Sequence, residues 1–136
     1  MYKTILIPIH MAHVEKGKAM IDIAMAQRGE DTQVILLNVV EVVPAWIASQ
    51  LPIGILDESL QSTLVELKAI ADAANINADV EVREGHPYKT ILEVADKFGA
   101  ELIIIASHQP GLEDYFLGST AAKVVRHAKC SVLVVR

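Results

Sequence analysis

A glycine followed by two hydroxyl residues, Gly118, Ser119 and Thr120, opens an alanine-rich segment near the end of the chain. The amphipathic pattern that follows predicts a helix over residues 120–128. The first turn of a helix carries backbone N–H groups without intrahelical partners, together with the positive end of the helix dipole. This combination is suited to binding an anion, most often a phosphate. The alternative is that Ser119 or Thr120 only caps the helix.

A polar loop follows an apolar run just upstream of this helix. Residues 102–106 read Leu-Ile-Ile-Ile-Ala, which predicts a strand covered on both faces, as strands of parallel sheets usually are. The next three residues are Ser107, His108 and Gln109. They follow the strand directly, so we expect them at its carboxyl end.

Histidine and acidic residues raise the question of a metal site. The histidines in predicted loops after strands are His10, His13, His86 and His108. Neutral imidazole is a common metal ligand, but no predicted helix carries two histidines four residues apart, and we assign no metal ligand. Glu113 and Asp114 could hold magnesium through water beside a bound triphosphate, or could form a solvated acidic loop.

No residues in the sequence suggest a nucleophile with a base and a third group that orients the base, so we assign no catalytic residue. The single cysteine, Cys130, is interpreted as a buried, inert thiol. One cysteine cannot form an internal disulfide, and the N-terminal residues do not resemble a signal peptide or a membrane span. The expected location is therefore the cytoplasm.

The elements that must position these residues alternate between strands and helices. Apolar runs of high β propensity predict strands over residues 4–9, 33–40, 79–84, 102–106 and 131–135. Helical spacing of apolar residues predicts helices over residues 14–28, 57–74, 87–98 and 120–128. Gly29 and Gly99 are expected to end helices, and Pro87 to begin one. Residues 41–56, interrupted by prolines and Gly54, are expected to form an irregular lid or packing loop.

This alternation predicts the α/β fold class, an open five-stranded parallel sheet with right-handed crossovers and helices on both faces. Residues 79–84 alternate between apolar and polar side chains, so their strand is expected to be half exposed near a sheet edge. With the strand order 3-2-1-4-5, the order reverses between the first and fourth strands, and ligands of such sheets bind outside that point. The loops there are residues 8–13 and 107–117.

The composition favours one well-cored domain spanning residues 1–136. Hydrophobic residues make up 52% of the chain and charged residues 21%, which excludes a disordered protein. The formal net charge of -5 argues against nucleic acid or an anionic membrane as a general partner, because both attract clustered lysine and arginine.

These features together resemble the universal stress protein family along the whole chain. The motifs that carry the resemblance are an opening Ile-Leu-Ile-Pro, Val39-Val40, Gly85-x-Pro87, Ile-Ile-Ala-Ser-His, Gly-Ser-Thr and a terminal Ser-Val-Leu-Val-Val. The Leu-Gly-Ser-Thr-Ala-Ala-x-Val-Val-Arg-His stretch is similar to the F/G-like branch in particular. Ala106 and Gln109 stand where the nucleotide-binding pattern has glycines, and His10 stands where the family commonly has an acid.

The resemblance implies a Rossmann-like fold of the adenine nucleotide alpha hydrolase type, with an ATP or AMP site at the reversal of strand order, with or without Mg²⁺. It implies that adenine lies against Pro8, Ile9, His10 and Val39 or Val40. It implies that the ribose and phosphates lie along Ala106, Ser107, His108, Gln109, Gly118, Ser119 and Thr120. Lys123 and Arg126 either reach the phosphates or lie on the solvent face, and Trp46 and Met11 either wall the adenine pocket or pack elsewhere.

The resemblance also implies a homodimer through the C-terminal strands and a role in the stress response. Dimerisation has physical support of its own, since the strand over residues 131–135 would be an apolar sheet edge that a monomer normally has to cover. Two alternatives remain open, a nucleotide-free dimer that binds other proteins and a weak ATPase. The protein client is not indicated by any motif.

Overall fold

A computed structural model describes residues 1–107 and 118–136. The strands are β1 (Tyr2–Pro8), β2 (Arg28–Val40), β3 (Ala78–Glu84), β4 (Leu102–Ala106) and β5 (Ser131–Val135). The helices are α1 (Val14–Gln27), α2 (Ala45–Ala48), α3 (Ile55–Ala73), α4 (Pro87–Phe98) and α5 (Ser119–His127), and a 3₁₀ turn, η1 (Met11–His13), precedes α1.

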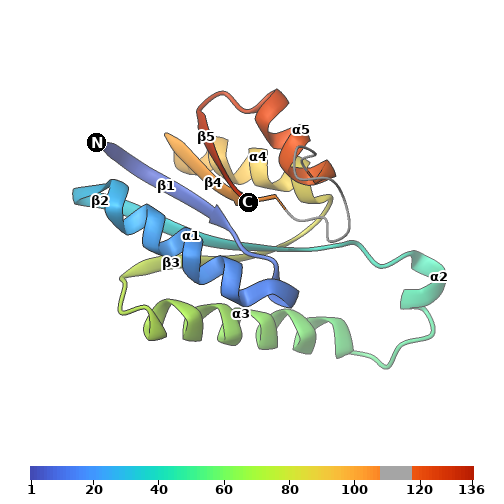
Figure 1. Cartoon of the computed structure of the whole chain (residues 1–136). Coiled ribbons are helices and arrows are strands. Elements are labelled where there is room, and N and C mark those ends of the chain that lie inside the picture. Colours follow the sequence, from blue (N-terminus) through green and yellow to red (C-terminus); the bar gives the residue numbers. More distant parts are fainter. Residues whose placement is uncertain (108–117) are drawn as a thin grey trace.

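The five strands form one parallel sheet in the order β3-β2-β1-β4-β5. The predicted fold class and strand order are therefore confirmed. β1 lies between β2 and β4, and the order of strands reverses at the β1–β4 pair (Figure 1). The carboxyl ends of β1, β2 and β4 consequently meet at one edge of the sheet.

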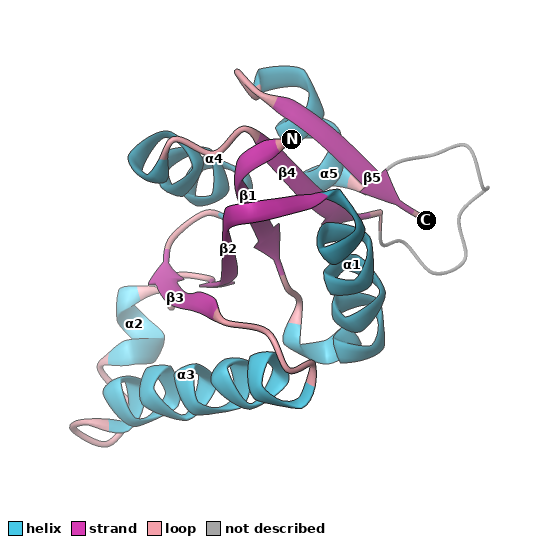
Figure 2. Cartoon of the chain, turned by 90° about the vertical axis from the view of Figure 1, so that its left-hand side faces the viewer, coloured by secondary structure: helices cyan, strands magenta, loops and turns pink. Residues whose placement is uncertain are grey.

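Helices cover both faces of the sheet, as predicted. α1 and α3 pack on one face and α4 and α5 on the other (Figures 1 and 2). Alternate strand residues point to opposite faces, so Ile104 joins α1 and α3 in one apolar cluster, while Ile103 and Ile105 join α4 and α5 in another. This explains the uninterrupted apolar sequence of β4, because both of its faces are buried.

The two edge strands are less buried than the central ones. β3 is half exposed, which confirms the interpretation of its alternating sequence. β5 lies at the opposite edge, where β4 is its one partner among the described strands and its four apolar residues are half-buried.

The end of α1 differs from the prediction. Gly29 does not end the helix, because β2 already begins at Arg28, where the backbone is extended at φ -77° and ψ 150°. The Gly29 N–H donates to Thr32 Oγ1 at 2.6 Å, and that hydroxyl donates to the Tyr2 carbonyl oxygen at 2.7 Å. These bonds join the start of β2 to β1. The pairing of the two strands shifts register between Tyr2 and Thr4.

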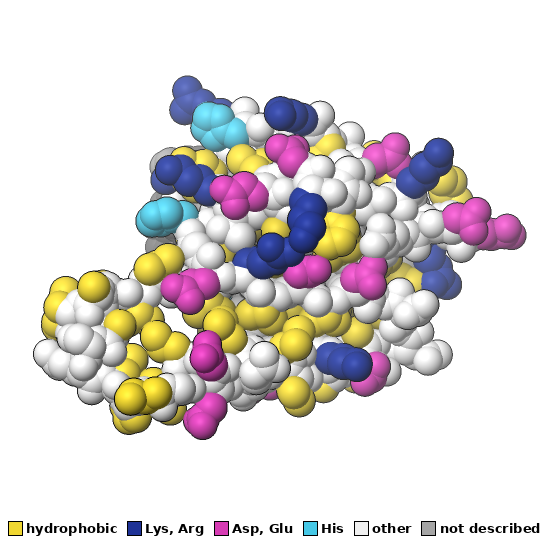
Figure 3. Space-filling view, turned by 180° about the vertical axis from the view of Figure 1, so that it is seen from behind, with side chains coloured by type: hydrophobic (Ala, Val, Ile, Leu, Met, Phe, Trp, Pro, Cys, Tyr) yellow, Lys and Arg dark blue, Asp and Glu magenta, His cyan; other side chains and the backbone are white. Residues whose placement is uncertain are grey.

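The segment expected to be wholly irregular contains the short helix α2, and α3 begins at Ile55 rather than at residue 57. Gly54 precedes α3 with φ +87°, a left-handed conformation that suits glycine. Residues 42–56, here called the α2 arm, carry no charged side chain, and none of them is buried. Figure 3 shows hydrophobic side chains gathered on this lobe, which projects from the body of the molecule.

Within residues 1–107 and 118–136, no helix is long and apolar enough to cross a lipid bilayer.

Candidate functional site

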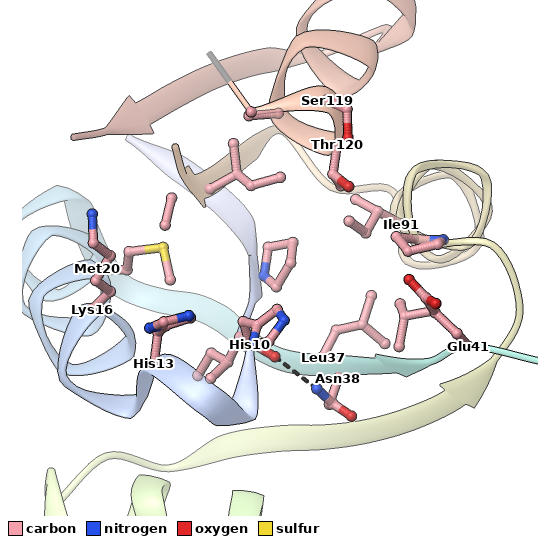
Figure 4. Close-up of a pocket in the computed structure, with 18 residues that line it drawn as sticks. His10, His13, Lys16, Met20, Leu37, Asn38, Glu41, Ile91, Ser119 and Thr120 are labelled. Carbon is pink, nitrogen blue, oxygen red and sulfur yellow. Dashed lines mark hydrogen bonds between the residues drawn. The ribbon is translucent and has the colours of Figure 1, made fainter. Parts of the chain in front are cut away.

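A cavity of about 380 Å³ opens at the carboxyl edge of the sheet, at the reversal of strand order (Figure 4). Its walls come from the ends of β1, β2 and β4, the N-terminal halves of α1 and α4, and the start of α5. Its size lies within the usual range for small-molecule sites, and apolar side chains with a few polar groups line it. The fold therefore builds one cleft from segments far apart in the sequence.

Most of the residues predicted for the site meet in this cavity. Those that line it are Pro8, Ile9, His10, Val39, Ala106, Gly118, Ser119 and Thr120. Val40 and Ser107 lie beside it rather than in its lining. The Val40 carbonyl accepts the Gly85 N–H at 2.9 Å, and the Ser107 N–H donates to the Val135 carbonyl at 2.8 Å. His108 and Gln109 lie outside the described residues.

Asn38 holds the loop after β1 in place, and sequence reasoning missed it. Its side chain is 8% exposed, and Nδ2 donates to the Ile9 carbonyl oxygen at 2.8 Å. The Ile9 N–H in turn donates to the Leu37 carbonyl at 2.7 Å. A buried amide in an otherwise apolar strand needs a partner, so the isolated asparagine in the run over residues 33–40 was the available signal.

His10 caps the start of the short turn η1 at the cavity. Its Nδ1 accepts the Ala12 N–H at 3.2 Å, and its ring centroid lies 5.2 Å from that of His13. Both imidazoles line the cavity, so a paired aromatic and polar surface lies where β1 passes into α1.

The start of α5 bears on the choice between a helix cap and an anion site. The N-cap residue is Gly118, with φ -63° and ψ 156°, and it has no side chain to accept the first N–H groups. Ser119 and Thr120 lie inside the first turn, so the interpretation of either as the cap is wrong. In the described part of the chain no side chain caps this helix, and its first turn lines the cavity. The backbone N–H groups and the dipole are arranged to receive an anion.

α1 supplies a wall that the sequence analysis did not predict as a unit. His13, Lys16 and Met20 all line the cavity, at the i, i+3 and i+7 spacing that places residues on one helix face. Lys16 Nζ donates to the Ser107 carbonyl oxygen at 3.4 Å, which links α1 to the end of β4. The helical spacing groups Lys16 with Met20, but only the packing of α1 against the sheet shows that this face lines the cavity.

The far side of the cavity is formed by the end of β2 and the start of α4. Glu41 points into this side beside the side chain of Ile91 (Figure 4), and Pro87 also lines the cavity. Ile91 and Leu37 belong to the apolar cluster under α4. The cavity thus has an apolar floor and polar groups at its rim.

Among the described residues, the other candidate side chains do not line the cavity. Trp46 is 68% exposed on the α2 arm, and Met11 packs against the core beside α1. Lys123 and Arg126 are exposed, and Lys123 Nζ lies 4.9 Å from the centre of the Tyr88 ring. Glu113 and Asp114 lie outside the described residues, and among the rest no three His, Cys, Asp or Glu side chains gather as metal ligands would.

Cys130 is half-buried rather than buried as predicted. Burial raises the pKa of its thiol, the nearby Asp96 carboxylate adds to the increase, and a backbone hydrogen bond opposes it. A raised pKa lowers the thiolate fraction at neutral pH, so this cysteine is a poor nucleophile.

Comparison with known proteins agrees with this architecture. The model of the universal stress protein family matches residues 1–136. The chain belongs to the universal stress protein family. It is 35% identical to universal stress protein MJ0531 of Methanocaldococcus jannaschii over 100% of this chain and 83% of that protein. It is 29% identical to universal stress protein G of Escherichia coli O157:H7 over the full length of both.

Several solved structures share this fold. The structure of hypothetical protein MJ0577 matches with a TM-score of 0.72 and 25% identity, over 99% of this chain and 96% of that one. A universal stress protein in complex with cAMP matches with a TM-score of 0.67 and 22% identity, over 99% and 97%. One from Archaeoglobus fulgidus in complex with dAMP matches with a TM-score of 0.69 and 17% identity, over 99% and 98%. Adenine nucleotides are thus bound within this family.

Proposed function

We propose that this universal stress protein binds an adenine nucleotide, ATP or AMP, in the cavity at the reversal of strand order and acts as a dimeric regulatory protein of the stress response. The observation that carries the proposal is the start of α5, which opens into the cavity without a side-chain cap in the described part of the chain. An uncapped helix start favours a negatively charged ligand.

The cavity offers different surroundings to the two ends of a nucleotide. Leu37, Val39 and Ile91 provide an apolar floor at the end of β2, which suits the adenine ring. The first turn of α5 and Ala106 provide backbone on the other side, which suits the ribose and phosphates. The cAMP and dAMP complexes of relatives support the proposal, because they place an adenine nucleotide on the same fold.

Magnesium would bind together with the phosphates rather than in a site made of protein ligands alone. Glu41 is the sole carboxylate among the described residues that line the cavity. Mg²⁺ commonly keeps several waters and binds one or two carboxylates together with substrate phosphates. Glu41 lies across the cavity from Lys16 (Figure 4), so water and phosphate oxygens would provide most of the coordination.

The proposal is tested by the content and affinity of the purified protein. Mass spectrometry and absorbance at the nucleotide band, on protein prepared without added ligand, should detect adenine nucleotide. Calorimetric titration should then give saturable binding of ATP or AMP and none of flavin mononucleotide. Absence of saturable binding for both adenine nucleotides would reject the proposal in favour of a nucleotide-free interaction dimer.

A pair of substitutions at Gly118 ties binding to the start of α5. The backbone conformation of Gly118 is extended, so other residues can adopt it. Asp caps helices well and places a carboxylate on the anion site, whereas Asn caps equally well without charge. We expect Gly118→Asp to weaken nucleotide binding more than Gly118→Asn does, and equal affinities would contradict an electrostatic site. Phosphate release from ATP that persists unchanged in Gly118→Asp would indicate a contaminating ATPase.

A further inference from the structure

Lys16 is a half-buried cation in the wall of the cavity, and it lacks a counter-ion in the described part of the chain. Its described polar contact is the 3.4 Å hydrogen bond from Nζ to the Ser107 carbonyl. This is long, because charge-assisted N–H···O bonds are typically about 2.7–2.9 Å. Moving an ammonium partly out of water costs free energy unless an opposite charge compensates. An anion in the cavity would provide that charge.

The formal charges of the cavity lie on opposite sides. Among the described lining residues, Lys16 is the sole lysine or arginine and Glu41 the sole acid. Lys16 projects from α1 toward the end of β4, whereas Glu41 lies beside the start of α4 (Figure 4). The uncapped start of α5 adds its positive dipole end to the cavity. This distribution orients a bipolar ligand with its anionic group toward Lys16 and away from Glu41.

We infer that Lys16 binds the phosphate of the ligand directly and that the cavity therefore selects adenine nucleotides with a terminal phosphate over adenosine and cyclic monophosphates. The inference rests on the proposed function. A terminal phosphate carries about -1.5 to -2 charge at neutral pH, whereas a phosphodiester carries about -1. Lys16 exchanges its long hydrogen bond to the Ser107 carbonyl for a charge-assisted bond to phosphate. The binding free energy gained by this exchange is larger for a terminal phosphate than for a phosphodiester, because the terminal phosphate carries more negative charge.

The test compares Lys16→Met with Lys18→Met. Lys18 lies on the same helix but is exposed and outside the cavity lining, so its substitution removes an equal charge without touching the site. Calorimetric titrations with AMP, cAMP and adenosine are run at two salt concentrations. Lys16→Met should weaken AMP binding about 10- to 100-fold and reduce its salt dependence, with a smaller loss for cAMP and a change within about twofold for adenosine. Lys18→Met should resemble the wild type.

Two results would overturn the inference while leaving the proposed function intact. One is wild-type affinity for AMP in Lys16→Met, and the other is an equal loss for AMP and adenosine, which would show that Lys16 only supports the fold. If the wild type binds no adenine nucleotide, the proposed function fails and inorganic pyrophosphate becomes the probe. Thermal stabilisation by pyrophosphate that Lys16→Met removes, and Lys18→Met does not, would still support a phosphate-binding lysine. Absence of this pyrophosphate stabilisation in the wild type would overturn the inference about Lys16.

Discussion

Asn38 links two strand ends through a single buried hydrogen bond, and the position of the loop after β1 depends on it. Replacing Asn38 with Leu keeps the branched shape of the side chain but leaves the Ile9 carbonyl oxygen without its 2.8 Å donor. We expect Asn38→Leu to lower the free energy of unfolding by about 1–3 kcal/mol. Urea denaturation followed by circular dichroism measures this loss.

The same substitution at Asn77 is the control for Asn38→Leu. Asn77 is exposed, so Asn77→Leu should change the free energy of unfolding by less than about 0.5 kcal/mol. Asn38→Leu should also weaken nucleotide binding, because Ile9 lines the cavity. A stability change as small as that of the control would show that the hydrogen bond contributes nothing to the fold.

The thiol of Cys130 gives a prediction about pH. Its pKa is raised in the folded protein, first by burial. Folding therefore favours the neutral thiol, so its contribution to stability is complete below the ordinary thiol pKa and is lost as pH rises through the folded value. Wild type should accordingly lose more stability at alkaline pH than Cys130→Ser does. The alkaline denaturation curves of the two proteins measure the difference, and parallel curves would contradict it.

At the scale of the element, the end of α4 depends on the backbone of Gly99. Gly99 has φ +65° and ψ 40°, a conformation that costs a residue with a Cβ about 1–2 kcal/mol. We expect Gly99→Ala to destabilise the protein by about 1 kcal/mol in urea denaturation. Gly29→Ala is the matched control, since Gly29 lies in β2 and a Cβ there would meet its nearest atom at an ordinary 3.4 Å. Equal effects of the two substitutions would contradict the role of the left-handed conformation.

The elements most accessible to sequence reasoning are those whose pattern is determined by burial. β4 is apolar at every position because it lies between two helix layers, and Gly99 ends α4 as expected. Gly29 is different, because a glycine after a helical pattern indicates a stop only when the helix continues up to it. Pairing of Arg28 with Tyr2, which is remote in sequence, ended α1 earlier. Local signals cannot report such a contact.

The residues of the candidate site also divide into those with a local sequence signal and those without one. Gly118, Ser119 and Thr120 could be predicted because a helix start has a local signature. Lys16 could not, since α1 carries several charged residues and only the packing of α1 against the sheet decides which of them faces the cavity. Val40 lies outside the lining, whereas Val39 lies in it, and the Val40 carbonyl pairs with Gly85, a contact that depends on how the loop after β3 returns.

At the scale of the whole molecule, the exposed edge of β5 is the basis of the proposed dimer. Val134 is half-buried on this edge strand, and a charge there should prevent the edges of two copies from pairing. We expect Val134→Lys to sediment as a monomer while the wild type sediments as a dimer. Val65→Lys is the control, because Val65 is 68% exposed on α3, away from this edge. A dimer that persists in a folded Val134→Lys protein would contradict an interface through β5.

The α2 arm determines what an intrinsic fluorescence experiment would measure. Trp46 is the single tryptophan of the chain, and it lies on α2, where no residue is buried. Its indole is already largely in water, so acrylamide should quench it in the native protein nearly as well as in urea. Emission would therefore change little when the sheet unfolds, and would respond instead to whatever contacts the arm. Trp46 fluorescence is therefore a poor probe of unfolding of the core and a specific probe of contacts made by the α2 arm.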